Sequence, residues 1–145
     1  MLRALSVLAF AAMVVGIAGL FRANALFAHQ PWVIAIQVAM FMLMVAARIT
    51  FGRRSFHAAA DPTEGGLVTT GPYAYLRHPI YAAAIHFVWA GALDHGFSWS
   101  VIGWAETVTA GAFTRMHIEE YLLVRKYPEY REYKKRAKKL IPFVY

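Results

Sequence analysis

Two clusters of charged and aromatic residues stand next to the last two apolar segments of the chain. The first is the stretch 71–81, whose sequence GPYAYLRHPIY joins an Arg-His pair to three tyrosines. The second combines Arg115 with the adjacent carboxylates Glu119 and Glu120. The planar fork of Arg77 suits a carboxylate or a phosphate. Two neighbouring carboxylates at a membrane surface need a cation, which an ammonium, a sulfonium or an arginine would provide. The clusters therefore predict a binding site for a charged small molecule.

Each cluster also has a purely structural interpretation. Tyrosine and arginine are common anchors at headgroup depth, so the stretch 71–81 is also typical of an interfacial anchor. Arg115 and Glu119 are four residues apart on one predicted helix, where a surface salt bridge contributes only a few tenths of a kcal/mol, roughly. Glu120 is rotated from Glu119 by about 100° and faces another direction. Both interpretations stay open on the residues alone.

The composition is typical of a membrane protein. Of the 145 residues, 59% are hydrophobic and only 16% are charged. The formal net charge is +7, and nine of the fifteen Lys and Arg residues lie at 115–139. Beside membrane segments, anionic lipid is a simpler partner for that basic region than nucleic acid. The chain has no cysteine, which excludes disulfides, thiolate metal sites and cysteine nucleophiles.

Four apolar segments predict an all-α fold, an integral membrane helical bundle with about four transmembrane segments. They lie at residues 4–21, 31–50, 79–93 and 97–114, and the last two form a helical hairpin. The first segment followed by Ala-Asn-Ala also resembles a signal peptide. Its apolar run is longer than the roughly 7–15 residues of a signal core, so we expect it to be retained.

Polar segments complete a single predicted domain at residues 1–145. A loop at 61–78 leads into the third apolar segment, and a basic amphipathic C-terminal helix at 115–139 follows the fourth. Lys and Arg are concentrated after the second segment and in the C-terminal region. This bias places both termini and both polar clusters on the cytoplasmic side of the membrane. In a bacterium, this membrane would be the inner membrane.

His86 and Glu106 lie within the third and fourth apolar segments. Ionisable residues at such depth are functional candidates and are usually paired with one another. A hydrogen-bonded structural pair is the equal alternative. A metal site is disfavoured because no second ligand stands three or four residues from His86, so no metal ligands are predicted.

The two motifs together resemble a known superfamily. The pattern Gly-x-Tyr-x-x-x-Arg-His-Pro-x-Tyr at 71–81 is similar to the signature of the isoprenylcysteine carboxyl methyltransferases and phospholipid methyltransferases. The C-terminal part of the chain resembles the closing motif of the same superfamily. It contains Arg115 with the Glu-Glu pair, then the tyrosine-rich stretch 127–133, and then Leu-Ile-Pro at 140–142. The resemblance spans about residues 65–143. Ala82 and the Tyr-Pro at 127–128 depart from the pattern without touching a charged residue.

The resemblance implies S-adenosylmethionine as cofactor, bound at the cytoplasmic face. It implies that Arg77, Arg115 and Glu120 are the catalytic candidates, the arginines steering a carboxylate of the cofactor or of the acceptor. The implied cofactor-binding residues are Leu67, Val68, Thr70, Gly71, Tyr73, His78, Tyr81, Glu119 and Glu120.

Methyl transfer to a lipophilic acceptor is the predicted function, most simply to the carboxylate of a prenylcysteine-like substrate, which needs no general base. Phospholipid or small-amine N-methylation is the alternative and requires deprotonation of the amine. A non-catalytic lipid-binding membrane protein is a further alternative. A nicotinamide-dependent sterol reductase is disfavoured because those chains are much longer. The sequence does not specify the acceptor or the oligomeric state.

Overall fold

The computed structural model of the chain describes residues 1–52 and 66–141. Its helices are α1 (Leu2–Arg22), α2 (Pro31–Phe51), α3 (Pro79–His95), α4 (Trp99–Lys126) and α5 (Tyr130–Arg136), with a short 3₁₀ turn, η2, at Gly71–Ala74. The described residues contain no strand beyond one isolated bridge between Leu76 and Lys138. The predicted all-α class is therefore confirmed. Residues 61–65 of the predicted loop at 61–78 lie outside the described residues.

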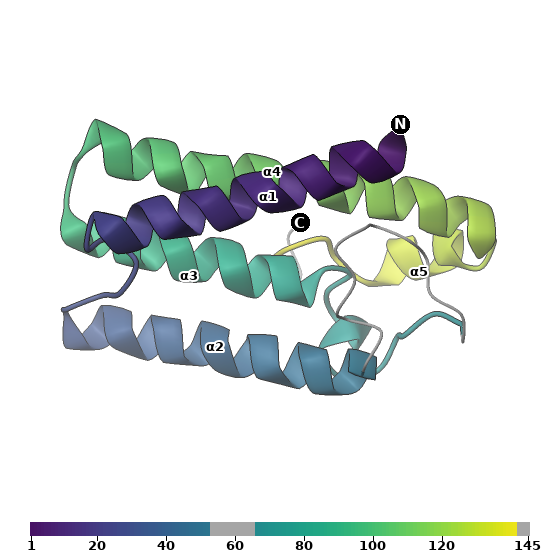
Figure 1. Cartoon of the computed structure of the whole chain (residues 1–145). Coiled ribbons are helices and arrows are strands. Elements are labelled where there is room, and N and C mark those ends of the chain that lie inside the picture. The colour runs from purple at the N-terminus through teal and green to yellow at the C-terminus, as the bar shows by residue number, and fades with distance from the viewer. Residues whose placement is uncertain (53–65, 142–145) are drawn as a thin grey trace.

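The long helices run along a common direction, with α3 between α2 and the α1–α4 pair (Figure 1). α1 packs chiefly on α4, and α2 chiefly on α3. α1 and α4 are antiparallel, because Ser6 near the start of α1 contacts Arg115 and Gly19 near its end lies against Trp104. The N-terminus of α1, the C-terminal part of α4, α5 and η2 therefore gather at one end of the bundle.

Glycines allow α1 and α4 to approach closely. A Cβ added to Gly16 would lie 2.9 Å from the Trp104 carbonyl oxygen, and one added to Gly111 would lie 2.7 Å from that of Ala9. Small residues at such contacts are typical of membrane helices, where packing rather than water exclusion drives association. The buried stripe of α1 consists of Ser6, Ala9, Met13, Gly16 and Leu20.

Two of the described helices, α1 and α2, are long and apolar enough to cross a membrane. Their outward faces carry large apolar side chains, such as Leu8 at 66% and Met42 at 60% exposure, which water would disfavour and lipid tolerates. α3 has 17 residues, or about 26 Å of helix against a hydrocarbon core of about 30 Å. Four membrane spans remain a prediction.

The C-terminal helix predicted at 115–139 is divided in two. α4 continues without a break through the predicted span end at residue 114 to Lys126, and α5 is a separate helix of 7 residues. Pro128 is the physical reason, since a proline disfavours helical backbone in the residue before it. Tyr127 accordingly has an extended conformation, with φ −126° and ψ 94°.

Polar side chains join the helices at the other end of the bundle. Gln37 on α2 donates to the carbonyls of Leu26 (2.8 Å) and Phe87 (3.0 Å) and accepts from the Ala28 amide (2.9 Å). The buried carboxylate of Asp94, at the end of α3, accepts from the His29 amide just before α2. A negative charge there complements the positive end of the α2 dipole. These bonds fix α2 against α3.

The close contact of Gly111 with α1 predicts that alanine substitutions at Gly111 and Gly103 of α4 have different effects on stability. Gly111→Ala forces a Cβ against backbone and should destabilise the fold by about 1–3 kcal/mol, as overpacking does. At Gly103 an added Cβ has nothing within 4 Å, so Gly103→Ala should leave the melting temperature unchanged or slightly raised. Thermal unfolding in detergent micelles measures both. Equal melting temperatures for the two variants would contradict the close packing of α1 on α4.

Candidate functional site

The carboxylate of Glu120 is the centre of a polar cluster at the end of the bundle where α5 and η2 lie. Its Oε1 accepts from Arg77 Nε at 2.9 Å and lies 3.1 Å from His78 Nε2. Its Oε2 lies 2.8 Å from Lys134 Nζ. Glu120 is on α4, Lys134 is on α5, and the Arg-His pair immediately precedes α3. One buried carboxylate thus joins three elements.

The surrounding cations determine the ionisation of Glu120. Burial by itself would raise the pKa of this carboxyl, but hydrogen bonds from His78 and Lys134 and the charges of His78 and Arg77 outweigh burial. The net result is a pKa well below the ordinary value for glutamate. Glu120 is therefore an ionised structural anion and a weak base.

Arg77 is held inside the protein rather than offered to a ligand. Besides Glu120, its guanidinium binds the carbonyls of Lys134 (3.1 Å) and Ala137 (2.8 Å) through Nη1. These carbonyls lie at the C-terminal end of α5, where a cation complements the helix dipole. Its side chain is only 12% exposed. Arg77 therefore connects the segment that precedes α3 to the C-terminal end of α5.

Glu119, the neighbour of Glu120, belongs to a second group of contacts. Tyr81 donates its hydroxyl to Glu119 Oε1 at 2.5 Å, and Arg115 Nε donates to the same hydroxyl oxygen at 2.7 Å. The Arg115 guanidinium also approaches Glu119 at 3.6 Å, so the pairing predicted from their spacing is present. Arg115 is 5% exposed and binds the Ser6 carbonyl on α1 at 3.2 Å. Arg115 is therefore buried and Glu119 partly buried, so the pair is not an exposed surface salt bridge.

α5 and the segment after it hold the η2 region in place. Tyr133 donates its buried hydroxyl to the Tyr73 carbonyl at 2.6 Å, and burial raises the pKa of Tyr133 to about 12. The Arg77 amide donates to the Lys138 carbonyl at 2.7 Å, and the Lys138 amide donates to the Tyr75 carbonyl at 2.9 Å. The backbone that precedes α3 is thus fixed from both sides.

The structure brings together the sequence-predicted residues Tyr73, Arg77, His78, Tyr81, Arg115, Glu119 and Glu120. Leu67 packs against the α5 tyrosines. Val68 is partly buried, whereas Thr70 and Gly71 are exposed. At Gly71 the positive φ of 55° favours glycine. Sequence reasoning gave no role to Lys134 or Ser6, which contact the site, and named Tyr133 only as part of the closing motif.

His86 and Glu106 are not brought to the site or to each other. Both are exposed on their helices, and His86 Nδ1 bonds the Ala82 carbonyl of its own helix at 2.7 Å. Within residues 1–52 and 66–141 no group of three His, Cys, Asp or Glu residues could hold a metal. The predicted pairing of these two residues is therefore wrong.

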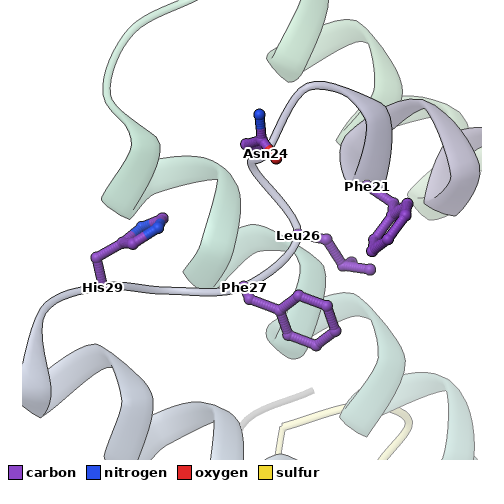
Figure 2. Close-up of a pocket in the computed structure, with 5 residues that line it drawn as sticks. All are labelled: Phe21, Asn24, Leu26, Phe27 and His29. Atoms are coloured by element: carbon purple, nitrogen blue, oxygen red, sulfur yellow. The ribbon is translucent and has the colours of Figure 1, made fainter.

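A small pocket lies far from the cluster, at the connection between α1 and α2. Phe21, Asn24, Leu26, Phe27 and His29 line it, as Figure 2 shows, and its volume is about 110 Å³. Pockets for drug-sized ligands measure roughly 300–1,000 Å³. This pocket is too small for a nucleoside cofactor, so the polar cluster remains the candidate site.

A family sequence model described as phospholipid methyltransferase matches residues 49–130, more than half of the chain. The match includes the stretch 71–81, Arg115 and both carboxylates of the cluster. The chain belongs to the phospholipid methyltransferase family. Together with the isoprenylcysteine carboxyl methyltransferases, this family forms a superfamily of membrane methyltransferases. No curated protein sequence and no solved structure gave a significant match to the chain.

Membership of the phospholipid methyltransferase family gives the class of reaction. Its members are S-adenosylmethionine-using methyltransferases, and the family indicates a lipid-related substrate. Together with the apolar α1 and α2, it indicates a membrane protein. The matched residues end at the start of α5. Lys134 and Tyr133 on α5, and Ser6 on α1, contact the site from outside the matched residues.

The low pKa of Glu120 predicts a specific response to acid. A carboxyl whose pKa is lower folded than unfolded stabilises the protein above the unfolded value, and that contribution is lost as pH falls toward the folded value. The melting temperature in detergent should therefore begin to fall below about pH 5 and should continue to fall as the pH is lowered further. Glu120→Gln should lower stability at pH 7 by about 3 kcal/mol, because it leaves buried cations unpaired, and should flatten the acid response.

Glu132→Gln is the matched control. Glu132 pairs with Lys135 on the exposed face of α5, where its side chain is 68% exposed. This variant should keep both the wild-type stability and the wild-type acid response. An acid response in Glu120→Gln as steep as that of the wild type would show that Glu120 does not supply it.

Proposed function

We propose that the chain methylates the carboxylate of a lipophilic, prenylcysteine-like acceptor with S-adenosylmethionine. The observation that carries this proposal is that both carboxylates of the cluster are already paired with cations. Glu120 faces Arg77, His78 and Lys134, and Glu119 faces Arg115, Tyr81 and, at 3.7 Å, His78. Within the described residues, the cluster offers poor general bases. A carboxylate acceptor suits such a site because it is ionised near pH 7.

The cofactor supplies a methyl group on a sulfonium, and an in-line displacement by the acceptor oxygen leaves the electron pair of the broken bond on sulfur. The protein has to align the two partners and exclude water. No proton moves when the acceptor is a carboxylate. The buried, interlocked cluster suits this task, since its side chains are held by two or more contacts each.

We assign the two carboxylates different roles. Glu119 has a side chain that is 24% exposed, whereas that of Glu120 is 10% exposed and turned toward its cations. Glu119 is therefore the carboxylate that would meet the cofactor ammonium or ribose, with Tyr81 and the backbone of 67–73 beside it. Glu120, Arg77 and Arg115 act as positioning residues that fix the elements around the cofactor.

Orientation follows from charge. The exposed cations Arg125, Arg131, Lys135 and Arg136 all lie on the last turn of α4 or on α5, at the end of the bundle that carries the cluster. Positive residues concentrate on the cytoplasmic side of membrane proteins. We therefore propose that the cluster faces the cytoplasm, where the cofactor is found, and that the acceptor enters from the bilayer.

Methylation of a phospholipid amine is the second candidate, and the match to the phospholipid methyltransferase family favours it. An amine must lose a proton before it attacks, and Glu119 is the more accessible carboxylate for that step. In this case the rate would rise with pH as the amine deprotonates.

Cofactor binding is tested by calorimetric titration of the detergent-purified protein with S-adenosylhomocysteine. Glu119→Gln should weaken binding about tenfold, the equivalent of one charge-assisted contact. Glu106→Gln removes an exposed carboxylate from the same helix and should bind as the wild type does. Absence of binding by folded wild-type protein, or equal weakening in both variants, would contradict the proposed cofactor site.

The acceptor is tested with methyl-labelled S-adenosylmethionine and two substrates, farnesylcysteine and phosphatidylethanolamine vesicles. Labelled methyl esters of farnesylcysteine release methanol in alkali, whereas N-methyl groups are stable. Alkali-labile label is the expected result. Stable label in the phospholipid alone would replace the carboxylate acceptor with the amine.

A further inference from the structure

Lys139 is a buried cation for which the described residues provide no carboxylate. The residue is 6% exposed. Its Nζ lies 3.5 Å from His117 Nε2 and 5.7 Å from the centre of the Phe113 ring. The other buried or partly buried cations of this region, Arg77, Arg115 and Lys134, each have a carboxylate oxygen within 2.8–3.6 Å. Lys139 therefore stands apart from them.

An unpaired buried charge is costly, so buried ammonium groups normally have an anionic partner. Burial lowers the pKa of Lys139, although the charge of Glu120 counteracts part of this effect. An ammonium has three donors, and the single contact with His117 is at the outer limit of hydrogen-bond length. Donors remain for an additional acceptor at this position.

His117 is oriented to serve the same acceptor. Its Nδ1 lies 2.7 Å from the Phe113 carbonyl oxygen, which can only accept, so Nδ1 carries the proton of that bond. In the neutral ring Nε2 then accepts from Lys139. In the protonated ring Nε2 is a donor instead, and both it and the Lys139 ammonium can donate to one shared anion. His117 is exposed, so the Lys139–His117 pair reaches the surface of α4.

If α4 crosses the membrane as the sequence predicts, the pair lies at the depth of lipid headgroups. His117 follows the predicted end of the fourth apolar segment, residue 114, by three residues, or about 4–5 Å of helix. The headgroup layer extends roughly 5–8 Å beyond the hydrocarbon core on each side. Glu106, Ala110 and His117 are exposed on α4, and Phe113, four residues before His117, is partly buried.

Lys139 is also fixed beside the candidate site. Its carbonyl accepts from the His78 amide at 3.3 Å. The residue before it pairs with the backbone on both sides of Leu76. The ammonium is thus held by the same backbone that positions the Arg-His pair.

We propose that Lys139 and His117 bind the phosphate of a membrane phospholipid at the flank of the candidate site. Phosphate is the anion that phospholipids carry at this depth, and a lysine ammonium binds it as a point charge. The inference goes beyond the proposed function and requires neither the cofactor nor a particular methyl acceptor.

The test is calorimetric titration of protein in dodecyl maltoside with diheptanoylphosphatidylglycerol below its micelle concentration. Lys139→Met should weaken binding about tenfold, and His117→Gln about threefold. Lys138→Met is the matched control, because the neighbouring lysine is partly buried and contributes its backbone to the pairing; it should bind as the wild type does. Diheptanoylglycerol, which lacks the phosphate, should not distinguish wild type from Lys139→Met.

Three results would overturn the proposal. The first is wild-type lipid affinity in Lys139→Met, and the second is an equal loss in Lys138→Met. The third is full competition by inorganic phosphate at millimolar concentration, which would assign the site to free phosphate. Lys139→Arg keeps the charge and should retain lipid binding, which separates loss of the cation from misfolding. S-adenosylhomocysteine binding, measured on the same samples, is expected to be unchanged.

Discussion

The ionised carboxylate of Glu120 is the interaction on which the functional end of the molecule depends. Cations from two separate parts of the chain converge on it: the adjacent Arg77 and His78 before α3, and Lys134 on α5. The same Arg77 binds the end of α5, so the carboxylate and that helix share one guanidinium. Loss of one partner from such a buried pair costs about 3–5 kcal/mol, and the effect would spread to every element joined there.

The two adjacent glutamates on α4 face different parts of the cluster. The rotation of about 100° between neighbours turns Glu120 toward α5 and Glu119 toward Tyr81 on α3. Arg115, one turn earlier, connects Glu119 to α1 through the Ser6 carbonyl. The cluster is therefore continuous from α5 to α1, although only part of it lies within the residues of the family match.

The sequence predicted those contacts that depend on local spacing or on a sequence motif. Helical spacing predicted the Arg115–Glu119 pair, and the need of two carboxylates for a cation led to Arg77. The predicted boundary at residue 114 is not a helix end, because hydropathy falls there while the hydrogen bonds of α4 continue to Lys126, and the single helix predicted at 115–139 is interrupted near Pro128. The contacts of Lys134, Ser6 and Lys139 depend on tertiary packing, which no local pattern encodes. His86 and Glu106 were paired by depth alone, and they occupy different outward faces.

The contact between α1 and α4 has a consequence for how the protein is made. Ser6 and Arg115 are separated by 109 residues, so α1 leaves the ribosome long before its main partner exists. Until α4 arrives, the glycine face of α1 has only lipid or other proteins to contact. Contacts of such long range form late and leave intermediates exposed. The site is therefore assembled only after α4 and α5 have been made, when they meet α1.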